Sequence, residues 1–169
     1  MKKYLLFFFV AIAFVACNNE DSSIQPDAAR ASYEIQLSAN TFNTFDVYYV
    51  HLDNEGNEAT LSGGRLDNAH LMVQRSTFPC TFEGRLYIAP KADATCDELS
   101  YSVSMEVASV KKGPETGIDG YKIIQQDGYR ETFERKGISN LQAFADSFNM
   151  ESVKHSYLVL ANGKIQRIK

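Results

Sequence analysis

The feature that most constrains the fold is a series of short segments in which apolar and polar residues alternate. The clearest covers residues 101–108, where Tyr101, Val103, Met105 and Val107 alternate with polar or small residues. A period of two places each set on one face of a β-strand, so one face is predicted to be buried and the other solvated. A chain built from such segments is expected to stack sheets rather than bundle helices.

Similar segments recur along the chain between turn signals. Strands are predicted at 33–38, 45–52, 58–62, 71–75, 82–88, 101–108, 121–124, 129–135, 157–160 and 164–168. The segment 45–52 is apolar on both faces except at Asp46 and His51, which predicts a central strand covered on two sides. Asp127-Gly128 and Asn162-Gly163 each predict a hairpin turn.

One helix is predicted late in the chain. Leu141, Phe144 and Phe148 fall on one helical face, and Ser139 with Gln142 has the spacing of a capping box. A helix of about ten residues is marginal alone and is expected to pack on a sheet.

The composition agrees with a strand-rich chain, since it holds 9 Tyr and 11 Phe and aromatic residues favour strands. We predict a mainly β fold over residues 33–169, an antiparallel two-layer β-sandwich with one short helix in the C-terminal half. A small β-barrel is the alternative. The motif Tyr33-x-Ile35, followed by Val47-x-Tyr49, resembles small sandwich domains of bacterial lipoproteins of the immunoglobulin or transthyretin type. That resemblance implies the fold alone.

The N-terminal residues have a different organisation. Lys2 and Lys3 precede an apolar run at 5–15, and the small Ala16 stands before Cys17. This order is typical of an export signal. Because the run is shorter than the roughly 20 residues that span a bilayer, we expect it to be cleaved.

The stretch Phe14-Val15-Ala16-Cys17 resembles a bacterial lipobox, with Phe14 in place of the usual Leu. The resemblance implies a signal peptide at 1–16, acylation of Cys17 and anchoring in the bacterial outer membrane, where two or more acyl chains hold a protein stably. The alternative is an ordinary secretory signal cleaved after residues 11–13, which leaves Cys17 as a free thiol.

The acidic pair Glu20 and Asp21 resembles the export signal of Bacteroidetes-type surface lipoproteins. It implies display on the cell surface, and retention on the periplasmic side is the alternative. Residues 17–32 would then be the lipidated cysteine and a flexible tether, because this stretch is polar, contains Pro26 and lacks apolar periodicity.

The two remaining cysteines, Cys80 and Cys96, are a disulfide candidate because export leads to an oxidising compartment. A bridge would contribute about 3 kcal/mol in the chain-entropy model. The geometry opposes it if 82–88 and 101–107 form a hairpin, since the two cysteines would then lie at opposite ends. Two buried free thiols are the alternative.

No catalytic, cofactor-binding or metal-binding motif is present, and we predict no cofactor. His51, His70 and His155 lie in separate segments without zinc-ligand spacing. The polar cluster at 53–58 offers oxygen ligands without the spacing of an EF-hand loop, and a turn explains it.

The aromatic pair Tyr48 and Tyr87 is the binding candidate. If both lie on the outer sheet face, they form a platform for a glycan or protein ligand. The alternative is that the predicted helix covers that face.

These features predict a lipid-anchored envelope protein that acts as a non-catalytic binding or accessory module. An envelope hydrolase with a site built on loops, and a subunit or inhibitor in an envelope complex, are the alternatives. The chain has 17 basic and 21 acidic residues and no basic stripe. This composition excludes nucleic acid as a partner.

Overall fold

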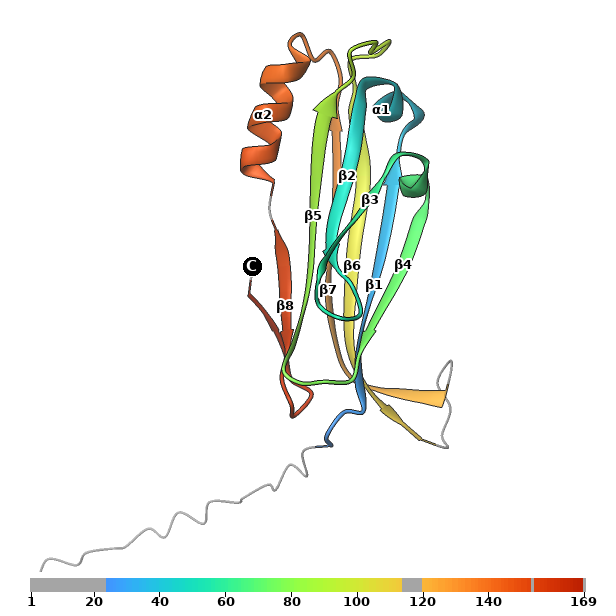
Figure 1. Ribbon diagram of the computed structural model, residues 1–169, viewed down its shortest axis with the longest axis vertical. Coiled ribbons are helices and arrows are strands. Elements are labelled where there is room, and N and C mark those ends of the chain that lie inside the picture. The colour runs from blue at the N-terminus through green and yellow to red at the C-terminus, as the bar shows by residue number, and fades with distance from the viewer. Residues whose placement is uncertain (1–23, 114–119, 153, 169) are drawn as a thin grey trace, which may run out of the picture.

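The computed structural model of the chain describes residues 24–113, 120–152 and 154–168. Two antiparallel sheets pack face to face in an elongated sandwich, with a helix along one side (Figure 1). The predicted signal peptide, Cys17, Glu20 and Asp21 lie outside the described residues.

Both sheets are open, which confirms the predicted sandwich and rules out the closed barrel. Sheet A contains, in spatial order, β4 (Ala69–Arg75), β1 (Ala28–Leu37), β6 (Leu99–Lys112) and β7 (Tyr121–Arg135). Sheet B contains β3 (Glu58–Ser62), β2 (Phe45–Leu52), β5 (Cys80–Pro90), β8 (His155–Val159) and β9 (Ile165–Arg167). The helical elements are α1 (Ala39–Thr44), the 3₁₀ turn η1 (Gly63–Leu66) and α2 (Leu141–Glu151).

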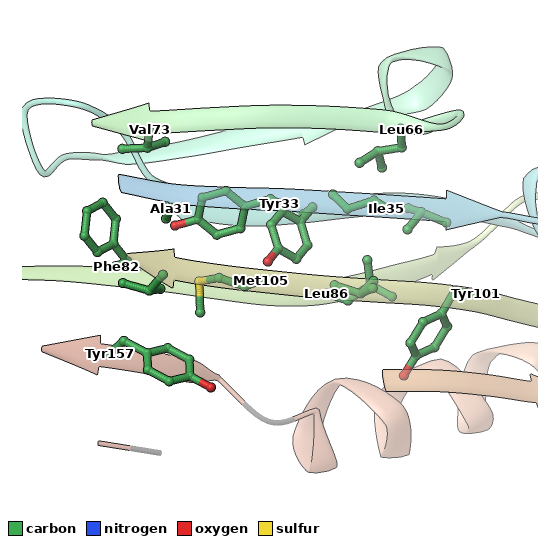
Figure 2. Packing of buried hydrophobic residues seen from close by; sticks show 14 of the residues in the cluster. Ala31, Tyr33, Ile35, Leu66, Val73, Phe82, Leu86, Tyr101, Met105 and Tyr157 are labelled. Atoms are coloured by element: carbon green, nitrogen blue, oxygen red, sulfur yellow. The ribbon is translucent and has the colours of Figure 1, made fainter. Parts of the chain in front are cut away.

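The core lies between the inner faces of the two sheets. Tyr33 and Ile35 of β1 point toward Phe82 and Leu86 of β5 (Figure 2), and Tyr33, Ile35 and Phe82 are fully buried. Alternation in the sequence thus correctly identified the inward face of both strands, because each sheet has one face on the core.

The first strand begins earlier than predicted. β1 starts at Ala28, so the expected flexible tether is wrong for its last five residues. Ala28 and Ala31 are buried, and Ala28 pairs with Val110 of β6. The alanines at 28, 29 and 31 give no clear alternation of apolar and polar residues, so the sequence did not predict a strand there. In the structure they pair with β6.

Strand β2 has the predicted bounds but is covered on one side. Phe45, Val47 and Tyr49 are buried, whereas Asp46 and Tyr48 are exposed. The expectation of burial on both faces is wrong because sheet B has one layer packed against it.

The predicted Asp127-Gly128 hairpin is wrong, since β7 runs through both residues as one strand. Gly128 has no positive φ, and it pairs with Glu106 of β6. A Cβ at position 128 would lie 2.6 Å from the carbonyl oxygen of Met105. The glycine therefore permits close approach of two strands rather than a turn.

Helix α2 is confirmed, with Asn140 rather than Ser139 as its N-cap. The Asn140 side chain accepts a hydrogen bond from the Ala143 N–H at 3.0 Å. The helix α1 was not predicted, because a helix of six residues is too short to show a period. Ser38 caps it by accepting from the Thr41 N–H at 3.1 Å.

Helix α2 lies along the edge of β5, where β8 ends. β5 pairs with β8 only over residues 80–84. Beyond them, the Asn149 side chain accepts from the Ile88 N–H at 3.0 Å and donates to the Ile88 carbonyl at 2.8 Å. Ser152 donates to the Leu86 carbonyl at 2.8 Å. The helix thus satisfies backbone groups that an edge strand would leave open.

Both Cys80 and Cys96 are free thiols, so the predicted disulfide is wrong. Cys80 begins the 11-residue strand β5, and Cys96 follows the other end of that strand. Such a strand spans about 35 Å, far beyond the reach of a disulfide. The alternative of two buried free thiols is confirmed for Cys80 and wrong for Cys96, which is only partly buried. The two strands do not form the hairpin considered, since β5 and β6 lie in different sheets.

Candidate functional site

The outer face of sheet A is hollowed along its length. Two grooves of about 530 and 520 Å³ lie over β1, β6 and β7. A smaller hollow of about 90 Å³ continues the first and shares Ser32, Glu106 and Gln126 with it. The larger volumes fall in the range of ligand sites, and both grooves are widely open to solvent, so a ligand would lie along the sheet face.

The strand register sets the side chains of this face in rows. Glu34 of β1 lies opposite Ser104 of β6, and Ser104 lies opposite Arg130 of β7. We define the sheet A groove by four rows, spaced about 7 Å apart: Gln36–Ser102–Thr132, His70–Glu34–Ser104–Arg130, Met72–Ser32–Glu106–Gly128, and Gln74–Arg30–Ala108–Gln126.

Small side chains form the floor of the sheet A groove, and longer ones form its walls. β6, in the middle of the groove, contributes the small Ser102, Ser104 and Ala108, with the longer Glu106 between Ser104 and Ala108. The longer side chains hold one another through hydrogen bonds across the strands: Arg30 to Gln74 at 2.7 Å, Ser32 with His70 at 2.9 Å, Gln126 to Glu106 at 2.5 Å, and Arg130 to Glu34 at 3.4 Å. These contacts preorganise the groove before any ligand binds.

A second polar cluster lies between the sheets, where β7 faces β8 and β9. Tyr101 donates to Glu131 at 2.5 Å, and the other oxygen of Glu131 lies 3.5 Å from Nε2 of His155. The His155 ring stacks on Tyr129 with 3.5 Å between ring centroids. Arg167 of β9 approaches Nδ1 of His155 at 3.3 Å.

These contacts fix the protonation of His155. A guanidinium only donates hydrogen bonds, so Nδ1 accepts from Arg167 and Nε2 carries the proton that faces Glu131. Burial lowers the pKa of His155 and Arg167 lowers it further, against the opposing effect of Glu131. The imidazole is therefore neutral in the folded protein at pH 7. Burial also raises the pKa of Tyr129 to about 12.

The cavity beside this cluster is small. Its volume is about 20 Å³, with Tyr49, Glu131, Ser152 and His155 among its lining residues. That volume holds one water molecule and no organic substrate. Ser152 donates its hydroxyl hydrogen to the Leu86 carbonyl, and both nitrogens of His155 have partners. Serine, histidine and glutamate thus meet here without the nucleophile-to-base contact of a hydrolase.

Tyr48 and Tyr87 share the outer face of sheet B, as the binding hypothesis requires. They lie directly opposite each other in the β2–β5 register, and Tyr48 is 37% exposed. The guanidinium of Arg85 lies 4.6 Å from the centre of the Tyr87 ring. Helix α2 runs beside the edge of β5, where its Asn149 carbonyl accepts a hydrogen bond from Arg85, and Tyr87 is half-buried. The neighbouring hollow includes Tyr87, and its volume of about 30 Å³ is too small for a ligand.

The three histidines lie apart. His51 is buried near the Tyr33 ring, His70 lies on the outer face of sheet A, and His155 lies between the layers. Among residues 24–113, 120–152 and 154–168, no three His, Cys, Asp or Glu side chains gather as metal ligands. In the polar cluster at 53–58, Asp53 accepts hydrogen bonds from the Glu55 and Asn57 N–H groups, which is the expected turn.

Sequence reasoning missed both the groove and Glu131. The groove depends on pairing among β1, β6 and β7, which alternation within one strand does not reveal. Glu131 carried a signal, since it falls on the same face as Tyr129 and Phe133 in a predicted strand. A carboxylate in an inward-facing aromatic row indicates a buried polar contact.

Comparison with protein-family models, with curated proteins and with solved structures found no match. Within the described part of the chain, no helix has both the length and the apolar character needed to cross a membrane.

Proposed function

We propose that this protein is a lipid-anchored envelope protein whose domain is a non-catalytic binding module, and that its ligand lies in the sheet A groove. The observation that carries the proposal is the groove itself. It combines volumes of about 530 and 520 Å³ with side chains already held in place by hydrogen bonds. Such concave, preorganised surfaces are the usual form of binding sites.

The anchor rests on the sequence at Cys17. The apolar run, the lipobox-like stretch and the following Glu20 and Asp21 support an acylated N-terminus at the bacterial outer membrane. A Cys17→Ala variant is expected to leave the membrane fraction, and a variant that stays fully membrane-bound would refute the anchor.

The binding role is tested by filling the groove. Ser104→Arg places a long side chain on the floor, whereas Thr60→Arg makes the same change on the exposed outer side of β3. Retention of soluble polymers on the immobilised full-length protein is measured for a neutral polysaccharide, an acidic polysaccharide and a casein peptide mixture. The proposal expects at least one polymer to bind the wild type and Thr60→Arg but not Ser104→Arg. If no polymer distinguishes the two variants, the groove is not the binding site.

The hydrolase alternative has one observation in its favour, the contact between Glu131 and His155. A cavity of about 20 Å³ leaves no space for a substrate there. Binding in the groove therefore has the stronger support.

A further inference from the structure

We propose that the ligand of the sheet A groove is a neutral oligosaccharide bound in an extended form along β6. This inference rests on the proposed binding function and adds the chemical class of the ligand. It follows from the charge of the groove, the hydrogen-bonding groups on its floor and the apolar character of one end.

The charge of the groove opposes an anionic ligand. The outward-facing carboxylates of the two larger hollows are those of Glu34, Glu106 and Glu134, and Glu134 pairs with Lys136 at 2.7 Å. The guanidinium of Arg130 lies in the first of these hollows, and that of Arg30 lies at the far end of the groove. Arg130 is already engaged with Glu34 at 3.4 Å. The charged side chains of the groove are thus largely engaged with one another. A phosphate-rich or sulfated polymer would have to compete with these pairs, whereas a neutral ligand leaves them intact.

The hydrogen-bonding groups of the floor suit hydroxyl groups. Ser102 and Ser104 of β6 and Thr132 of β7 both donate and accept. The carboxylates and the amide of Gln126 add acceptors and a further donor. A sugar also presents hydroxyls that donate and accept in every direction, so it can satisfy both kinds of group.

An extended peptide fits the groove less well. Peptide recognition depends on a few side chains buried in apolar pockets, or on strand addition at a sheet edge. The two larger hollows instead lie over the face of a fully paired stretch of β1 and β6, and their outward-facing residues are predominantly polar.

The end of the groove near Arg30 is apolar. Met72 and Ile123 are each 53% exposed there, and they line the hollow of about 90 Å³ together with Ala108. The Arg30 guanidinium stacks on the Tyr121 ring at 4.1 Å. A polar stretch that ends in an aliphatic patch matches a saccharide, whose rings carry hydroxyls at their rims and C–H groups on their faces.

The experiment measures binding of neutral linear hexasaccharides of glucose, mannose, xylose, galactose and N-acetylglucosamine by isothermal titration calorimetry. The full-length protein is held in a polyoxyethylene detergent, because a detergent with a sugar headgroup would compete. We expect at least one hexasaccharide to bind the wild type and Thr60→Arg, and Ser104→Arg to weaken that binding by about tenfold or more.

A second variant guards against a folding defect. Glu106→Gln removes a groove carboxylate with little change of shape, and it is expected to weaken the same hexasaccharide while the thermal midpoint of unfolding stays unchanged. If only acidic polysaccharide or casein peptides bind, and Ser104→Arg abolishes that binding, the oligosaccharide inference is wrong and the binding function stands. If no probe depends on Ser104, both are wrong.

Discussion

Gly84 of β5 is the position where a single added carbon most directly tests how the Tyr49 ring of the neighbouring strand β2 packs in the core. Gly84 faces the core, and the ring of Tyr49 from β2 lies across it. A Cβ at position 84 would lie 2.8 Å from Cζ of Tyr49 and closer still to its hydroxyl oxygen, whereas ordinary contacts begin at 3.4 Å. Tyr49 is fully buried, so its ring has little freedom to withdraw.

Gly84→Ala is therefore expected to lower the free energy of unfolding by about 2 kcal/mol, the usual effect of overpacking a core. For a domain of this size, that change lowers the melting temperature by about 6 °C. Tyr49→Phe alone should lower the free energy of unfolding by about 1 kcal/mol or less, because the buried hydroxyl interacts with the Tyr129 side chain without a hydrogen bond of good geometry. In the Gly84→Ala background, Tyr49→Phe removes the closest atom and leaves Cζ at 2.8 Å, about 0.6 Å short of the 3.4 Å at which ordinary contacts begin.

The double variant should thus recover about 1 kcal/mol, which is a coupling energy typical of residues in contact. Urea denaturation followed by circular dichroism measures all four proteins. Gly64→Ala is the matched control, since a Cβ there meets nothing within 4 Å, and it should change stability by less than about 0.5 kcal/mol. If Gly84→Ala is as stable as the control, or Tyr49→Phe recovers nothing, the described packing of β2 against β5 is wrong.

Two further predictions concern titratable groups. Because the folded protein holds the pKa of His155 below its ordinary value of 6.5, the unfolded chain binds more protons below pH 6.5, so the free energy of unfolding falls as the pH drops through and below that value. Urea denaturation between pH 8 and pH 5 should show this loss in the wild type and a smaller loss in His155→Gln; equal losses would contradict the neutral imidazole. In alkylation with iodoacetamide followed by mass spectrometry without reductant, Cys96 should react before Cys80, because Cys80 is buried and its burial raises the pKa of its thiol. Protection of both thiols until a reductant is added would instead indicate a disulfide.

The sequence predicted those parts of the fold that depend on neighbouring residues. The alternation in β5 and β6, the apolar face of α2 and the Asn162-Gly163 turn all act within a few residues, and the structure confirms each. Local patterns of this kind report burial on one face and the geometry of a tight turn.

The sequence failed where distant contacts override local preference. Asp127-Gly128 is a hairpin signal in isolation, but pairing with β6 over the length of β7 keeps it extended. Ala28 and Ala31 carry little strand preference, yet both are buried beside β6. In each case a neighbouring strand far along the chain decides the conformation, as is general for β-structure.

The outward residues of β6 show how the groove and the fold constrain each other. β6 is paired on both sides, by β1 and by β7, a position in which β-branched residues would favour the strand. It carries Ser100, Ser102 and Ser104 on its outer face instead, while the inward Val103 and Met105 are buried. Serine adds little to strand stability, so the inward face must supply it. The small volume of these three serines also leaves space below the longer side chains of β7. The outer face of β6 thus carries small residues where β-branched ones would stabilise the strand, and the small residues leave the surface concave. This pattern is expected if the proposed binding site limits the stability of the fold.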